Sequence, residues 1–206
     1  MSAASFHSLY AALAPWMALS ILFIGRNPRP ALLRIVASLF VSSIVLLIPV
    51  GGFLLCRWIA LLGPNPSITL TALLAIALLT RIRGLELLRS QDWQAAWIFG
   101  SIAALILYPM GLGLTSMDSY TWGWGLMLPI ATTAVVTILL LSGNRFGVIL
   151  LLSLFGMLLS PMESSNKWDS LIDPFYAFFS LIAAIVLLVR KFTFAALANP
   201  NEIGGA

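Results

Sequence analysis

Seven apolar stretches occupy almost the whole chain of 206 residues, and they constrain its fold more than any other feature of the sequence. A bilayer core of about 30 Å needs about 20 apolar residues in a helix, because backbone N–H and C=O groups in lipid must be satisfied within the segment itself. The sequence therefore predicts an all-α fold, a polytopic transmembrane helical bundle of about seven spans. The candidate spans are Ser8–Gly25, Ile35–Cys56, Ser67–Thr80, Gln94–Leu114, Gly125–Leu141, Phe146–Ser160 and Phe175–Val189.

Six spans are the alternative, because the third and sixth stretches are short for a full crossing. In that arrangement the third segment is re-entrant, or the first stretch is a cleaved signal peptide. No Lys or Arg precedes the first stretch, so we expect it to be retained as a span. We expect a single integral membrane domain over residues 1–206, with residues 192–206 as a short cytoplasmic tail.

Composition separates this chain from soluble proteins. Hydrophobic residues make up 61% of it, and its mean hydropathy is +1.03, which leaves too few polar side chains to cover a surface in water. The net charge is +4, but the arginines are spread over the gaps between spans and do not gather on one face. We therefore expect the lipid bilayer as the partner of this surface, and no nucleic acid.

The basic residues predict an orientation. By the positive-inside rule, Arg26, Arg29 and Arg34 place the end of the first span in the cytoplasm and the amino terminus outside. Alternation of the spans then gives a cytoplasmic carboxyl terminus and leaves only Arg57 and Lys167 on the outer side. The other cytoplasmic basic residues are Arg81, Arg83, Arg89, Arg145, Arg190 and Lys191.

The tryptophans agree with this orientation, because an indole ring prefers the headgroup level of the membrane. Trp58, Trp122, Trp124 and Trp168 fall at outer boundaries, and Trp93 and Trp97 fall at an inner one. The cytoplasmic stretch from Arg81 to Trp93 mixes leucines with charges, so it is expected either as a short helix at the interface or as an extension of the third span.

Small residues predict how the helices pack. Ala96, Gly100 and Ala104 recur every four residues, which lets another helix approach the fourth span closely, and we expect an internal contact rather than a dimer interface. Helix-disrupting residues lie near the outer ends of the second and fourth spans, where kinks or unwinding would open a shallow outer cavity. They are Pro49, Gly51, Gly52, Pro109, Gly111 and Gly113.

The interior of the predicted spans lacks acidic and basic side chains. No Asp, Glu, Lys, Arg or His lies in the middle of a span, although such residues mark proton relays and ion pathways. The mid-span hydroxyls, for example Ser42 and Thr69, are expected to bond their own helix or a neighbour. The single His7 excludes sites that need two histidines, and the single Cys56 excludes an intramolecular disulfide. We therefore expect no catalytic centre, no cofactor and no metal site.

Two outer loops differ from the rest of the chain, because they concentrate acidic and aromatic residues. We predict that they converge into one outward-facing binding patch. Its candidate residues are Asp118, Tyr120, Trp122 and Trp124 from the first loop and Glu163, Asn166, Trp168, Asp169 and Asp173 from the second. A helix after Asn166 would place Asp169 and Asp173 one turn apart on the same face. Since Asp173 precedes Pro174, an N-cap of the last span is the alternative role for its carboxylate.

The second loop also carries a resemblance. Its residues Glu163, Ser164, Asn166, Trp168, Asp169, Leu171, Ile172, Asp173 and Pro174 resemble a segment of small, uncharacterised multi-pass proteins of bacterial inner membranes. The resemblance extends more loosely to residues 108–125. It implies a location in the bacterial inner membrane and no particular activity.

Two functions follow from these features. In the first, the chain is a non-catalytic accessory or scaffold component of an envelope system, and its outer loops bind another inner-membrane or periplasmic protein. In the second, it is a substrate-binding or transport subunit, and the acidic and aromatic groups receive a small solute or a lipid headgroup. Oxygen ligands for a hard divalent cation are a third use of the same carboxylates.

Overall fold

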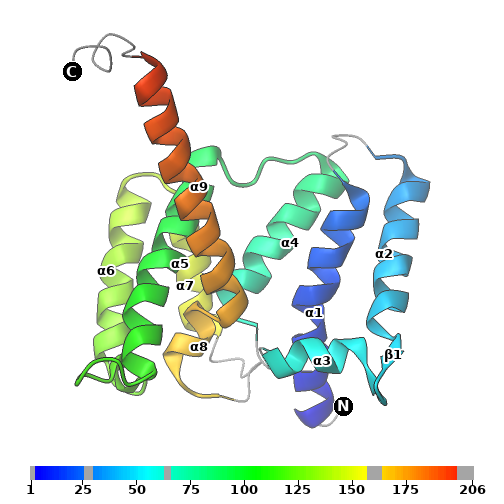
Figure 1. Ribbon diagram of the computed structural model, residues 1–206, viewed down its shortest axis with the longest axis horizontal. Coiled ribbons are helices and arrows are strands. Elements are labelled where there is room, and N and C mark those ends of the chain that lie inside the picture. Colours follow the sequence, from blue (N-terminus) through cyan, green and yellow to red (C-terminus); the bar gives the residue numbers. More distant parts are fainter. Residues whose placement is uncertain (1–2, 26–29, 63–65, 157–163, 199–206) are drawn as a thin grey trace, which may run out of the picture.

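The computed structural model describes residues 3–25, 30–62, 66–156 and 164–198, and the fold is all-α as predicted. The described part of the chain contains nine α-helices, one short 3-10 helix and one two-stranded hairpin (Figure 1). In chain order these are α1 (Ala3–Ile24), α2 (Leu32–Leu46), β1 (Pro49–Val50), β2 (Phe53–Leu54), α3 (Leu55–Leu62), α4 (Ile68–Arg83), α5 (Ser90–Gly111), η1 (Ser119–Gly123), α6 (Met127–Leu141), α7 (Phe146–Gly156), α8 (Lys167–Leu171) and α9 (Pro174–Ala198).

The long helices run side by side in alternating directions, so the molecule has two distinct ends (Figure 1). We call the end that holds the carboxyl-terminal half of α9 the upper end, as it is drawn. The carboxyl ends of α1, α4 and α6 also lie there. At the opposite, lower end lie the amino terminus, the hairpin, α3, η1 and α8. The described parts of the outer loops of the predicted topology therefore lie at the lower end.

Each of the seven predicted spans contains a helix, but the helices differ in length. Among the described residues, Ser90–Gly111 and Pro174–Lys191 are long and apolar enough to cross a membrane. Helix length alone thus supports two of the seven predicted spans. Four other apolar helical stretches contain between 10 and 17 described residues: Leu9–Ile24, Leu32–Leu46, Met127–Leu141 and Phe146–Gly156.

The second predicted span is wrong beyond Leu46. The chain there leaves the helix and forms a hairpin, in which Pro49 pairs with Leu54 and Val50 with Phe53. Gly51 and Gly52 form the turn with φ angles of +57° and +88°, a conformation that two-residue hairpin loops require and that glycine adopts without strain. The apolar residues up to Cys56 therefore belong to the hairpin and to α3.

The segment between the third and fourth spans also differs from both expectations. Helix α4 extends to Arg83 and stops at Gly84, whose φ of +69° is left-handed and ends the helix. The next helix begins only at Ser90, so residues 84–89 are neither an interfacial helix nor an extension of α4. Asp92, which is fully buried, fixes this linker by accepting hydrogen bonds from the backbone N–H groups of Arg89 (2.8 Å) and Arg145 (3.0 Å).

Close packing of α5 against α9 forms the main helix contact, and it uses the small residues that the sequence singled out. Ala96, Gly100 and Ala104 are all buried. A Cβ atom at position 100 would overlap the side chain of Ser180, and the hydroxyl of Tyr176 donates to the Ala96 carbonyl at 2.6 Å. The predicted internal contact is therefore confirmed.

Several mid-span hydroxyl groups bond to their own helix or to a neighbouring helix, as expected, whereas the buried Ser180 hydroxyl has no partner among the described residues. Ser42 donates to the Ser38 carbonyl and receives a hydrogen bond from Ser20 of α1 at 3.1 Å. Thr69 of α4 and Ser153 of α7 share a hydrogen bond of 2.9 Å. These bonds satisfy polar groups inside an apolar bundle.

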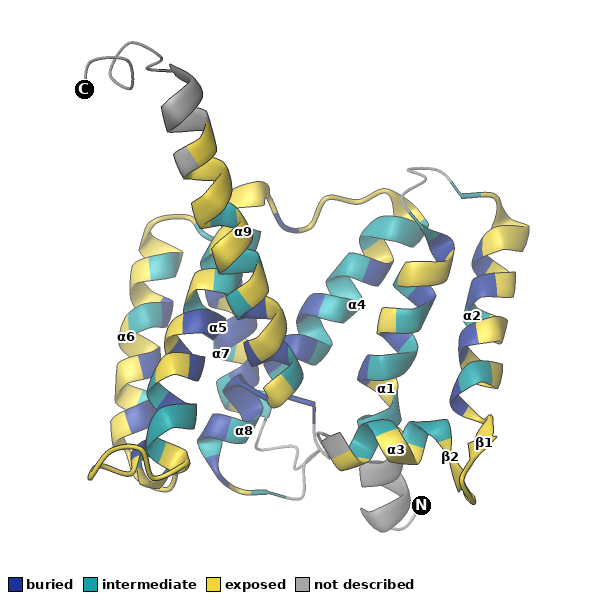
Figure 2. Cartoon of the chain, in the orientation of Figure 1, coloured by how far each residue is buried: buried dark blue, intermediate teal, exposed yellow. Residues whose placement is uncertain are grey.

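The outward faces of the helices are apolar. Figure 2 shows exposed positions along α2, α6 and α9, away from the buried contacts between helices. The exposed large hydrophobic residues of the bundle include Val36, Phe40, Ile44, Ile98, Ile102, Leu105, Ile130, Ile138, Leu152, Phe155, Ile182 and Ile185.

Candidate functional site

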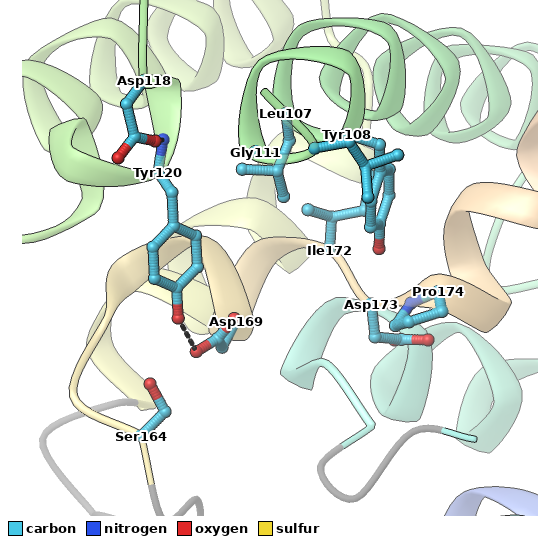
Figure 3. A pocket seen from close by; sticks show the side chains of 11 residues that line it. Leu107, Tyr108, Gly111, Asp118, Tyr120, Ser164, Asp169, Ile172, Asp173 and Pro174 are labelled. Atoms are coloured by element: carbon cyan, nitrogen blue, oxygen red, sulfur yellow. Dashed lines mark hydrogen bonds between the residues drawn. The ribbon is translucent and has the colours of Figure 1, made fainter. Parts of the chain in front are cut away.

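A cavity of about 530 Å³ lies at the lower end of the bundle, between the end of α5, the start of η1, the loop around α8 and the start of α9 (Figure 3). Helix α5 ends beside it at Gly111, one of the helix-disrupting residues that predicted an outer cavity. Its lining residues are Leu107, Tyr108, Gly111, Leu112, Asp118, Tyr120, Ser164, Asp169, Ile172, Asp173 and Pro174.

Four residues of the predicted patch line this cavity, namely Asp118, Tyr120, Asp169 and Asp173. Three of them are carboxylates, and no Lys or Arg is among the lining residues. The cavity therefore has an acidic rim beside an apolar wall formed by the last turn of α5. Charges of one sign around a concave surface reinforce one another, so a surface of this kind would favour cationic over anionic groups.

Asp169 and Tyr120 form the polar centre of the cavity, where their side chains point toward each other (Figure 3). The Tyr120 hydroxyl donates to Asp169 Oδ2 at 3.1 Å. Burial raises the pKa of Tyr120, and the negative charge and hydrogen bond of Asp169 raise it further. The phenol therefore stays a neutral donor at physiological pH. Asp169 is half-buried, and its Oδ1 accepts no hydrogen bond from the described residues.

Asp173 has a different role, because backbone groups saturate its carboxylate. Oδ1 accepts from the N–H groups of Phe175 (2.9 Å) and Tyr176 (3.0 Å), and Oδ2 accepts from the N–H of Ser67 (2.8 Å). The carboxylate caps α9 and at the same time joins its start to that of α4. The N-cap role is therefore confirmed.

The prediction that Asp169 and Asp173 share one helix face is wrong. Helix α8 ends at Leu171, and Ile172 is extended, with φ −146° and ψ 142°. Pro174 explains the break, since the residue before a proline is disfavoured in the helical conformation. Both carboxylates still reach the cavity, but from two different segments.

Asn166 and Trp168 lie behind the cavity and hold the two loops together. Asn166 caps α8 by accepting from the N–H of Trp168, and its amide donates to the Tyr120 carbonyl at 3.0 Å. The indole N–H of Trp168 donates to the Ser119 carbonyl at 2.8 Å. Both side chains are buried, so their role is to position Tyr120 rather than to contact a ligand.

The remaining members of the predicted patch do not line the cavity. Trp122 is half-buried, and Trp124 is exposed and lies edge-on to Tyr120 at a centroid distance of 6.4 Å. Lys167, the basic residue of the second loop, donates to the Gly123 carbonyl at 3.1 Å, at the end of η1. Glu163 lies outside the described residues.

Two residues at this site escaped the sequence analysis. Ser67 is buried and caps α4 through its hydroxyl, while its N–H binds Asp173. A serine directly before an apolar helix is a helix-start signal, so its capping role could have been recognised. Tyr108 contributes to the apolar wall one turn before the end of α5, and no local pattern distinguishes it from a core residue.

Within the described residues, no group of three or more His, Cys, Asp or Glu side chains could hold a metal ion. Comparison with protein-family models, with curated proteins and with solved structures finds no match for this chain. Its function has to be argued from the cavity and its surroundings.

Proposed function

We propose that the chain is a multi-pass protein of the bacterial inner membrane, with the lower end of the bundle outside and the upper end in the cytoplasm. The support is physical. Outward apolar faces on α2, α5, α6, α7 and α9 would be unfavourable in water, where monomeric proteins rarely expose large contiguous apolar patches. The shorter helices are accommodated by cover from neighbouring helices or by local thinning of the bilayer.

Reporter fusions test this topology. Fusions after Lys167 should be active only with a reporter that works outside the cytoplasm. Fusions after Arg89 and after Lys191 should be active only with a cytoplasmic reporter. A carboxyl terminus outside would contradict the seven-span arrangement and favour six spans.

We propose further that the cavity at the lower end binds an organic ammonium group, carried by a small solute or by a lipid headgroup. The observation that carries this proposal is the half-buried Asp169 in a concave site whose described lining includes no Lys or Arg. Its Oδ2 is held by Tyr120, while Oδ1 is directed to no donor among the described residues. An ammonium group supplies both the charge and the N–H donor that this oxygen lacks.

The cavity favours this function over the scaffold interpretation. A protein partner needs a surface of about 800 Å² and gains most from exposed aromatic anchors. Asp118, Tyr120 and Asp169 instead line a cavity of about 530 Å³, the size of a small ligand. Trp168 is buried and not available as an anchor, so the exposed tryptophan that the two loops offer is Trp124.

Thermal unfolding of the purified protein in mild detergent tests the proposal. Ethanolamine and phosphatidylethanolamine are the probes that represent the solute and the lipid source, with glycerol and phosphatidylglycerol as neutral and anionic controls. We expect one or both amines to raise the melting temperature, and the other two compounds to have no such effect. Stabilisation by ethanolamine alone identifies a soluble ligand, and stabilisation by the lipid alone identifies a headgroup.

The variant Asp169→Asn should reduce the affinity for the amine at least tenfold while the protein still folds, because the Tyr120 hydroxyl can donate to the Asn carbonyl oxygen as it does to the carboxylate. Glu86→Gln removes an exposed carboxylate at the upper end and is the matched control, which should bind as the unchanged protein does. If neither amine shifts the melting temperature, the binding proposal is wrong. Co-purification of a stoichiometric protein that Asp169→Asn releases would instead establish the scaffold function.

A further inference from the structure

The hairpin and α3 form a unit that lies across the lower end of the bundle, at a large angle to the long helices (Figure 1). The helix contacts α1 and α2. On that side Leu55, Cys56, Ile59 and Ala60 are only partly accessible. With eight residues, α3 is about 12 Å long, too short to cross a bilayer core of about 30 Å.

Apart from Arg57, the face of α3 that points away from the bundle is apolar. Trp58 and Leu61 lie on it at helical spacing and are exposed by 41% and 72%. Leu54, the last residue of β2, is exposed by 37% directly before the helix. A short surface helix in water would present polar residues on this side. The hairpin adds Val50 and Phe53, which are also exposed, to the same apolar surface.

Trp58 ties the hairpin to the helix. Its indole N–H donates to the Val50 carbonyl at 2.7 Å, and its ring meets that of Phe53 edge-on at a centroid distance of 6.1 Å. A hairpin of two residue pairs is not stable alone in water, so this contact explains why it persists. The hairpin and α3 therefore act as one surface.

Two observations identify what covers this surface. The apolar surface is continuous along the chain with the exposed side of α2, through Ile44, Leu47 and Ile48. The charge of this part of the chain is also positive only, because the first acidic residue of the whole chain is Glu86. Exposed Arg57 beside Trp58 is thus the charge that this unit presents, and it complements the phosphate groups of lipids.

We propose that residues 47–62 form an in-plane membrane anchor in the outer leaflet, in which Phe53, Trp58 and Leu61 reach the acyl chains and Arg57 meets the headgroup phosphates. This inference rests on the proposed membrane location. The Trp58 indole lies where the acyl chains meet the headgroups, a level at which indole rings are favoured. The anchor completes the short α2 at its outer end without a full helical span, and its hairpin and side-chain hydrogen bonds satisfy part of the non-helical backbone.

Site-directed spin labelling tests the anchor in liposomes of phosphatidylcholine and phosphatidylglycerol, because Cys56 is the only cysteine. In a Cys56→Ser background, Leu61→Cys and Phe53→Cys each carry a nitroxide. Ile102→Cys on the exposed side of α5 is the control for the bilayer interior, and Ser165→Cys in an outer loop is the control for water. The readout is collision with molecular oxygen, which concentrates in lipid, against collision with a water-soluble nickel chelate.

We expect the labels at positions 61 and 53 to favour oxygen at least threefold more than the label at position 165, at a depth shallower than position 102. If both behave as position 165 does while position 102 lies in lipid, the anchor is wrong and the spans remain. If both are shielded from oxygen and from nickel, a protein covers this surface, and the anchor is again wrong. A water-exposed position 102 would refute the membrane location itself. The two positions are independent, so one poorly folded variant leaves the other as the test.

Discussion

Replacing Asp173 with Asn separates the structural carboxylate of the cavity from the proposed binding carboxylate. Asp173 is 3% exposed, and three backbone N–H groups donate to it. An Asn side chain has one carbonyl oxygen, which can keep the two bonds that cap α9. Its NH₂ group would then face the Ser67 N–H, so two donors would meet and the bond that joins α9 to α4 would be lost.

The loss of stability in Asp173→Asn can be estimated from the hydrogen bonds that change. A hydrogen bond to a charged acceptor contributes about 1.5–3 kcal/mol, and a buried donor left without a partner costs a similar amount. We therefore expect Asp173→Asn to lower the free energy of unfolding by about 3 kcal/mol, a large share of the roughly 5–15 kcal/mol that holds a typical domain together. The assay is reversible denaturation by SDS in mixed micelles, followed by far-UV circular dichroism.

Asp118→Asn is the matched control. The Asp118 carboxylate caps η1 by accepting from the Tyr120 N–H at 2.9 Å, and the residue is exposed. An Asn is as good an N-cap as an Asp, so the change should stay within about 0.5 kcal/mol. Equal stabilities of the Asp173→Asn and Asp118→Asn proteins would refute the reasoning, because burial and the three amide donors would then carry no energetic weight.

Two glycine substitutions test the close contacts at the site and in the bundle. Gly123→Ala should cost about 1–3 kcal/mol in the same denaturation assay, because its Cβ would overlap Asn166 and push the two loops apart. Gly125→Ala, with open space around it, should be neutral, and a similar loss in both would contradict this contact. Gly100→Leu should separate α5 from α9, and we expect it to unfold at clearly lower temperature than the unchanged protein. An unaltered melting temperature would show that the overlap with Ser180 is relieved at no cost.

The positions of the helices were predictable, because a run of apolar residues and its interruption by Pro or Gly are local properties. The ends of the helices were predicted less well, although the sequence carries a signal for two of them. Gly84 after Arg83 marks the end of α4 by a signal that the sequence carries, a glycine that follows a basic last turn. The same holds for Ile172, where Pro174 two residues later indicated that α8 would not continue into α9.

Hydropathy could not distinguish a spanning helix from the hairpin and short helix that residues 47–62 form. Residues 47–62 are as apolar as the helices around them. They differ in the direction in which the chain runs, and this direction is determined by the contacts of α3 with α1 and α2. Gly51 and Gly52 did indicate a break in the second span, but not that the chain would turn back as a hairpin. Sequence spacing likewise suggested a shared helix face for Asp169 and Asp173. In the folded chain the two residues belong to separate segments, because α8 ends at Leu171 and Asp173 caps α9.

Of the described polar groups that the two outer loops bring to the cavity, one is best placed to bind a ligand, the carboxylate of Asp169. Backbone amides occupy one oxygen of Asp118 and both oxygens of Asp173, and buried Asn166 and Trp168 are committed to holding the loops. Asp169 alone combines partial burial, a fixed donor in Tyr120 and an acceptor oxygen with no bond from the described residues. Selectivity at such a site comes from the position of a single charge against the apolar wall of α5. We therefore expect the proposed amine site to distinguish ligands by the presence and size of an ammonium group rather than by the length of the molecule that carries it.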